Sequence, residues 1–518
     1  MTRLSEKRDA TRGQPKFWLW GCGLAASTAA IGLTVFAQSY FSLVADETVL
    51  AWIGKQAALG RRPYGDFFSF LPPGVIYGLA AFFKLVGPSL GALRLLTVLW
   101  LILVALCLFV LIARSGLPAS WSALAAFTTA SIFLPFWPVP SHHWFACGFG
   151  LMGLVLIWRE SAGSLRWFAG GMLIALSGLC LQTDGVFFLV LAALLWLTQD
   201  RRDRREALAA AAGLLLPVVL AALLLAFSGT LKEAFEDVVV FPLRYYRQGG
   251  GFNDVSALGS IEAFLRSYWT GRLSPRFLAT SSLQFVTLAL PALAALLPIT
   301  FLPKMIAERR LDRRWLVGAA GPAWCFALYL CGRADWTHLV LWSPLLVLLL
   351  LSSVRWGEER WRPRLLKVWL IFALAVSALR WPMVWLHHPP SARSVLSIDA
   401  SVSRQIRGDL LGLLPGALER RLPVTVLGVW GSRVYFYWTV DPPPLDVVMP
   451  PSSRYNAPGD YAVMASFLTS HGIPYVVMFT SDAGQFLQQP SPLQKVLRDS
   501  YLPFKTEAGL TILKRKDP

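Results

Sequence analysis

The sequence predicts a polytopic α-helical membrane protein with about eleven transmembrane helices and a small extracytoplasmic α/β domain at its C-terminus. Three observations predict this class. Of 518 residues, 55% are hydrophobic and only 15% are charged, whereas soluble domains are about 25% charged. The apolar residues lie in blocks such as Leu101–Ala113, which contains no charged or hydrogen-bonding polar side chain. After residue 385 the blocks stop, and short strand and helix patterns follow.

Each apolar block is expected to be a helix, because lipid cannot satisfy exposed backbone N–H and C=O groups. The blocks are long enough to cross, or nearly cross, the hydrocarbon core. The expected spans are roughly 17–44, 88–113, 118–140, 143–158, 166–181, 185–198, 207–227, 277–301, 315–332, 339–353 and 364–385. The first span follows a basic N-terminal stretch and is too long for a signal-peptide core, so we interpret it as a retained helix.

The net charge of +18 is explained by lysines and arginines in alternate short loops rather than by a nucleic-acid partner. Such loops face the cytoplasm. The short connections near 141–142 and 182–184 carry no Lys or Arg, so they are expected outside. This pattern predicts a multi-pass protein of the plasma or inner membrane, with a cytoplasmic N-terminus and an extracytoplasmic C-terminal domain. The basic loops contain Arg159 and Arg166; Arg201, Arg202, Arg204 and Arg205; Lys304, Arg309, Arg310, Arg313 and Arg314; and Arg355, Arg360, Arg362, Arg364 and Lys367.

Three segments are then extracytoplasmic: 45–87, 228–276 and 386–518. The first two belong to a transmembrane domain over residues 1–385, and the third is the C-terminal domain. In the first segment, Asp46–Leu59 and Val75–Val86 have helical apolar spacing. The first is expected to lie in the membrane interface, and the second to be either re-entrant or interfacial; a proline-rich link joins them.

The tail predicts an α/β fold. Thr425–Val429 and Tyr475–Phe479 have the composition of buried strands, and Gly509–Lys514 has that of a closing strand. Gly459–Ser470 and Pro492–Tyr501 are expected to be helices. The six cysteines lie in or beside apolar blocks, which is typical of packing residues rather than of a zinc site or a disulfide framework.

Asp46 and Glu47 stand where the first span leaves the membrane. One interpretation is that they stabilise the positive end of the next helix dipole. The other is that one of them is a general base, because a partly shielded carboxylate has a raised proton affinity. Asp66 is a second carboxylate in the same segment. Its neighbours Arg61 and Arg62 have the composition of a lipid headgroup anchor.

Cations for a phosphate group could come from Arg333 and His338, which lie between two expected spans on the outer side. Arg333 could bind phosphate through two parallel hydrogen bonds. The alternative is that Arg333 and Asp335 only cap helix ends.

Five further residues are candidates for binding substrate. His142 and His143 are adjacent on an outer turn, where one could face a cavity and the other the interface. Asp184 heads a helix, so it is a candidate binding residue or only a cap. Lys232 and Arg244 lie in a basic, aromatic stretch, which could close over a phosphate or simply be an amphipathic interfacial segment.

The first outer segment resembles membrane glycosyltransferases of the GT-C superfamily. The resemblance is carried by Asp46-Glu47, Pro63-Tyr64-Gly65-Asp66, Pro72-Pro73-Gly74, Phe82-Phe83, Gly87 and Arg94, over about 50 residues. It is closest in character to the protein O-mannosyltransferase-like group, which includes aminoarabinose–lipid A transferases.

The resemblance implies an enzyme that moves a sugar from a polyprenyl-phosphate carrier to an extracytoplasmic acceptor, usually with inversion. It assigns the base role to Asp46, with Glu47 beside it and Asp66 as a second acidic residue. It also places Tyr64 and Arg94 among the binding residues. The sugar and the acceptor, whether glycolipid, polysaccharide or protein, are left open, as is a divalent cation near Asp46.

Three other functions compete with transfer. A transporter or flippase would show two similar halves or ionisable groups at the bilayer midplane, and the ionisable residues cluster instead at the outer rim. A lipid-linked polymerase or ligase would place its main loop late in the chain. A non-catalytic scaffold would have no need of the acidic pair.

Overall fold

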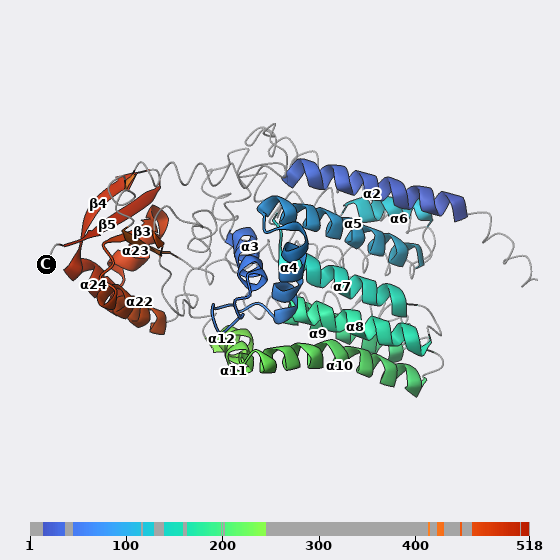
Figure 1. Ribbon diagram of the computed structural model, residues 1–518. Helices are drawn as coiled ribbons and strands as arrows, with labels where there is room; N and C mark the ends of the chain where they lie inside the picture. The colour runs from blue at the N-terminus through green and yellow to red at the C-terminus, as the bar shows by residue number, and fades with distance from the viewer. Residues whose placement is uncertain are drawn as a thin grey trace, which may run out of the picture.

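The computed structural model describes residues 14–36, 45–114, 118–128, 139–158, 163–197, 199, 203–244, 413–414, 422–428, 446–447, 458–507 and 509–516. Within these ranges the chain forms a bundle of apolar helices followed by a small α/β unit (Figure 1).

Three described helices are long and apolar enough to cross a membrane: α2 (Gln14–Phe36), α5 (Leu90–Arg114) and α10 (Arg204–Phe227). Figure 1 shows them running side by side with the shorter helices of the bundle. The shorter ones are α6 (Ala119–Thr128), α7 (His142–Ile157), α8 (Ser164–Cys180) and α9 (Gln182–Leu197).

Glycines let the helices of the bundle approach closely. A Cβ atom on Gly171 of α8 would lie 2.3 Å from the carbonyl oxygen of Ala210 in α10. A Cβ on Gly213 of α10 would lie 2.0 Å from the carbonyl oxygen of Phe168. Between helices in lipid there is no hydrophobic driving force, so association depends on close van der Waals packing, which small residues at such crossings permit.

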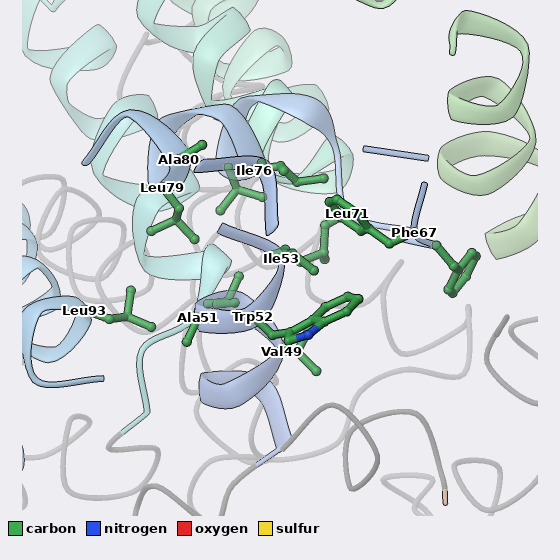
Figure 2. Packing of buried hydrophobic residues seen from close by; sticks show 14 of the residues in the cluster. Val49, Ala51, Trp52, Ile53, Phe67, Leu71, Ile76, Leu79, Ala80 and Leu93 are labelled. Carbon is green, nitrogen blue, oxygen red and sulfur yellow. The ribbon is translucent and has the colours of Figure 1, made fainter. Parts of the chain in front are cut away.

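Two helices lie across one end of the bundle, which we call the site end. They are α3 (Ala45–Ala58) and α4 (Pro73–Val86), and their axes run across the long helices (Figure 1). They pack face to face, since a Cβ on Gly54 would lie 2.8 Å from the Cβ of Leu79. Figure 2 shows Ile53 of α3 beside Leu71, Ile76 and Leu79 in the core between them.

A third short element follows α10 at the site end. It consists of α11 (Leu231–Phe235), the π-helix η3 (Glu236–Val240) and α12 (Phe241–Arg244). Pro242 accounts for the irregularity. A proline has no N–H to donate to the carbonyl four residues earlier, and its ring clashes with that carbonyl.

The C-terminal unit contains a five-stranded sheet in the order β2-β1-β3-β5-β4, beyond the site end of the bundle (Figure 1). Strands β2, β1 and β3 are parallel, and β5 and β4 form an antiparallel hairpin at one edge. The strands are β1 (Pro423–Leu427), β2 (Asp446–Val447), β3 (Tyr475–Phe479), β4 (Tyr501–Glu507) and β5 (Leu510–Arg515).

Three helices accompany this sheet: α22 (Pro458–Ser470), α23 (Thr480–Gln488) and α24 (Pro492–Ser500). Their apolar faces form the domain core together with β1 and β3. The helix side chains of that core include Met464, Phe467, Leu468, Phe486, Leu493 and Leu497.

The expected helical class and the small C-terminal sheet are confirmed. Both helices expected in segment 45–87 are present within two residues of their expected bounds, and their place at the outer membrane interface stays a prediction. The sequence did not predict α23, β2 or β4. The spans expected after residue 244 and the domain boundary at 385/386 lie outside the described residues, so the count of eleven and that boundary stay predictions.

Candidate active site at the site end of the bundle

A buried ion pair fixes the start of α3. Arg94 donates from Nε to Oε1 of Glu47 at 2.5 Å and from Nη2 to Oε2 at 2.8 Å, and both side chains are 0% exposed. Its Nη1 donates to the carbonyl of Phe36 at 2.8 Å. One guanidinium therefore connects the end of α2, the start of α3 and the first turns of α5.

Asp46 immediately precedes Glu47 in the first turn of α3. Because the neighbouring side chain is anchored by two charge-assisted bonds, the backbone at position 46 is held in a defined place. That place is the site end, where the first outer segment begins.

The linker between α3 and α4, residues 59–72, is ordered by Asp66. Its carboxylate accepts from the backbone N–H of Arg62 at 2.7 Å, from Nη2 at 2.9 Å and from Nε at 3.2 Å. The Asp66 N–H in turn donates to the Arg62 carbonyl at 2.9 Å. The Arg62 side-chain and backbone bonds hold the pKa of Asp66 below its usual 3.8, so Asp66 is ionised at neutral pH.

Tyr64 stands at the centre of this turn with a φ of 68°, a left-handed conformation that is rare for a bulky residue. Its side chain is 5% exposed, and its hydroxyl donates to the Leu71 carbonyl at 2.8 Å. Burial raises the pKa of Tyr64 well above its usual 10.0. The tyrosine thus closes the linker on itself and remains protonated.

The element after α10 packs on this linker. The Ser69 N–H donates to Oδ2 of the buried Asp237, at a long 3.4 Å. The ring of Phe241 lies 5.0 Å from that of Phe68 and 6.2 Å from that of Phe70. A Cβ on Gly65 would lie 2.8 Å from the Thr230 methyl.

A second bond ties this element to the bundle. The Val238 carbonyl, to which Pro242 has no N–H to donate, accepts from Nε2 of Gln182 at 3.0 Å. Segments more than 50 residues apart in the chain thus meet at the site end. Sequence reasoning missed Asp237. The sequence did contain a signal for a buried Asp237, because position 237 falls on one face of a helix together with Ala234 and Phe241.

The two histidines lie at the start of α7. Ser141 caps this helix by accepting from the His143 N–H at 3.4 Å. The two imidazole rings are 4.4 Å apart, and His143 is buried at 9% exposure. The following residues Phe145 and Ala146 share a core with α3 and α4, which places the start of α7 beneath those helices.

Asp184 lies in the first turn of α9, two residues after Gln182, and is only 4% exposed. The Thr183 hydroxyl donates to its carboxylate at 3.4 Å. Immediately after it, the α9 backbone crosses α8, because a Cβ on Gly185 would lie 2.3 Å from the Cα of Gly178.

Lys232 of α11 and Arg244 of α12 are exposed at the same end. The structure therefore brings Glu47 and Arg94 into direct contact and places Tyr64, Asp66, His142, His143, Asp184, Lys232 and Arg244 at the site end. Arg333 and His338 lie outside the described residues. The catalytic and binding roles of all these residues stay predictions.

No group of three or more His, Cys, Asp or Glu side chains with the geometry of a metal site occurs among the residues that the structure describes. The divalent cation that the sequence left open near Asp46 stays an open prediction.

No family model and no curated protein sequence matches this chain. Solved structures do match its fold. The oligosaccharyltransferase of Archaeoglobus fulgidus in its apo form matches with a TM-score of 0.53 and 11% identity, over 93% of this chain and 72% of that one.

ArnT from Cupriavidus metallidurans, bound to undecaprenyl phosphate, matches with a TM-score of 0.53 and 14% identity, over 95% of this chain and 97% of that one. Both neighbours are polytopic membrane enzymes of the GT-C superfamily. The predicted resemblance is thus confirmed at the level of the fold, and this chain has the fold of the GT-C glycosyltransferases.

Proposed function

We propose that this protein is a membrane glycosyltransferase that moves a sugar from a polyprenyl-phosphate carrier to an acceptor at the site end of the bundle. The single observation that carries the proposal is the buried contact of Arg94 with Glu47 and Phe36. This contact supports the proposal because it anchors the residue next to Asp46, the predicted base, on the fold of lipid-carrier transferases.

The donor class is supported by the neighbouring structures. ArnT was solved with undecaprenyl phosphate, and the Archaeoglobus enzyme was solved with dolichol phosphate and an inhibitory peptide. A lipid phosphate is itself a good leaving group, so this chemistry requires no nucleotide-binding domain. The bundle offers the donor a lipid-facing approach.

The proposed reaction is a displacement at the anomeric carbon. Asp46 takes the proton from an acceptor hydroxyl, and the acceptor oxygen forms a bond to the anomeric carbon. The bond from that carbon to the phosphate oxygen breaks, and polyprenyl phosphate leaves with the electron pair. Attack opposite the leaving group inverts the anomeric configuration.

The departing phosphate gains negative charge in the transition state, so cations near it accelerate the reaction. Among the predicted binding residues that the structure describes, Lys232 and Arg244 are exposed cations at this end. Arg333 and His338 are predicted to join them. Arg94 is already bonded to Glu47 and Phe36, and it has a positioning role in this proposal.

The proposal is tested by transfer assays with the purified protein in lipid nanodiscs. A panel of polyprenyl-phosphate sugars is offered with lipid A, other glycolipids, polysaccharide or peptide acceptors, and products are identified by mass. Asp46→Asn is expected to lower the rate by about 100-fold or more, because general-base catalysis contributes on that scale.

Glu233→Gln is the matched control, since Glu233 is an exposed carboxylate at the same end, and it should retain the full rate. Unchanged transfer in Asp46→Asn removes the base assignment. A protein that moves labelled sugar lipid between leaflets without forming any product is a flippase, the alternative that the neighbouring transferases do not favour.

A further inference from the structure

The element after α10 carries a stripe of exposed apolar side chains. Leu231, Phe235, Val239 and Leu243 are 46%, 58%, 38% and 76% exposed. They recur every four residues across α11, η3 and α12, and they continue a repeat that begins at Phe227, which is 87% exposed. Four consecutive members of such a repeat form one surface.

The π-helix keeps this repeat on one side of the element. An α-helix has 3.6 residues per turn, so a four-residue repeat drifts around it by about 40° at each step. The wider turn of η3, which includes Val239, accommodates an extra residue. Over Leu231–Leu243 the wider turn therefore reduces the drift, and the stripe remains one surface.

The opposite side of the element is firmly held. Ala234, Asp237 and Phe241 are buried, and the contacts of Asp237 with Ser69 and of Phe241 with Phe68 attach it to the linker between α3 and α4. The exposed stripe therefore belongs to an element that is packed on its other face.

The stripe follows, after a short turn at residues 228–230, a helix whose exposed apolar side must face lipid. Along α10 the side chains of Leu220, Leu223 and Leu224 are 46–56% exposed, and α10 is long and apolar enough to cross a membrane. Its 24 residues span about 36 Å, more than the roughly 30 Å of a hydrocarbon core. The stripe begins four residues after α10 ends, at the border of this lipid-facing surface.

Two basic residues stand near the ends of the element, which also carries the acidic Glu233, Glu236 and Asp237, so its net charge does not by itself select a lipid surface. Lys232 and Arg244 are both exposed and stand near the two ends of the stripe. Lysine and arginine flanking an apolar face favour the phosphate headgroups of a bilayer.

We propose that residues 231–244 form an interfacial helix whose stripe of Leu231, Phe235, Val239 and Leu243 lies among the lipid acyl chains at the site end. Through Asp237 and Phe241, this helix holds the linker between α3 and α4 at the depth of the headgroups. The proposal concerns the bilayer as a partner and does not depend on sugar transfer.

The test is a nitroxide accessibility scan of the full-length protein in phospholipid vesicles. Single cysteines replace residues 231–244 one at a time, in a background in which the six native cysteines are removed, and each is spin-labelled. Collision with oxygen reports exposure to acyl chains, and collision with a water-soluble nickel chelate reports exposure to water. Glu233, exposed on the same helix, is the matched control position.

Labels at 231, 235, 239 and 243 should show a high oxygen accessibility and a nickel accessibility at least about fivefold below that at 233. Nickel accessibility at the stripe equal to that at 233 would place it in water and overturn the proposal. Low accessibility to both reagents would mean that protein, a second copy or another part of this chain, covers the stripe, which also overturns it.

Discussion

Two arginine–carboxylate pairs organise the region around α3 and the linker to α4, and they lie in opposite environments. Glu47 and Arg94 are both 0% exposed, whereas the side chains of Asp66 and Arg62 are 33% and 57% exposed. The buried pair joins residues 47 positions apart in the chain, and the exposed pair joins residues four apart. The chemistry of the two pairs is the same, but the buried pair holds the start of α3, whereas the exposed pair holds a turn in the linker.

The difference in burial shows which of the two ion pairs the geometry of the candidate site depends on. Loss of one partner of a buried pair leaves an uncompensated charge in a low dielectric, so the Glu47–Arg94 pair is critical for the position of α3. An exposed pair exchanges its partner for water at little cost, so Arg62–Asp66 shapes a turn that other contacts, such as Tyr64 to Leu71, also hold.

The largest effect is expected from breaking the buried pair. Glu47→Ala leaves Arg94 without its carboxylate and should lower the free energy of unfolding by about 3–5 kcal/mol. It should also abolish sugar transfer, because the start of α3 loses its anchor. Thermal unfolding in detergent, together with the transfer assay, measures both.

A double variant separates stability from positioning. Glu47→Leu with Arg94→Met replaces the pair by apolar side chains and should recover most of the stability, since such replacements are often neutral. Transfer should stay low if the pair positions Asp46. Recovery of both properties would mean that the pair contributes only packing.

A smaller effect is expected where α4 meets the bundle. A Cβ on Gly74 would lie 2.7 Å from the carbonyl oxygen of Leu179, in the backbone of α8. Gly74→Ala therefore forces the two helices apart and should cost about 1–3 kcal/mol, with a matching loss of transfer.

Gly78→Ala is the control on the same helix, because a Cβ there has no atom within 4 Å. Its higher helix propensity should leave the protein equally or slightly more stable. Equal melting temperatures for the two variants would contradict a close α4–α8 contact.

The smallest effect is expected at the exposed pair. The pKa of Asp66 is lowered in the folded protein, chiefly by the Arg62 side-chain bond and then by the Arg62 N–H. The stabilisation is therefore complete above the usual pKa of 3.8 and is lost as the pH falls through the lower folded value.

Hydrogen exchange at residues 62–66, corrected for intrinsic rates, should show protection at about pH 6 that declines as the pH falls below the usual 3.8 of the carboxyl group. Asp66→Asn should remove this pH dependence while leaving the global melting temperature unchanged. A large drop in that temperature would show that the exposed pair matters as much as the buried one.

The local structure was readable from the sequence. Apolar blocks predicted the described membrane helices to within a few residues at their starts, and the composition of short buried strands predicted β1 and β3, with a closing strand predicted at β5. These signals work because helices satisfy their backbone groups locally, as lipid requires. The hairpin strand β4 was missed because its pattern is largely exposed and lacks the buried alternation that marks a strand.

The sequence by itself also determined which residues could carry chemistry in the first outer segment, because acidic and basic side chains are rare in so apolar a chain. Only the tertiary structure decided that Glu47 contacts Arg94 and that Asp237 contacts Ser69, 168 positions away. Such contacts depend on how the helices cross, and the crossing is set by glycine contacts such as those of Gly74 and Gly185. Close packing of that kind involves both partners at once, so no single stretch of sequence encodes it.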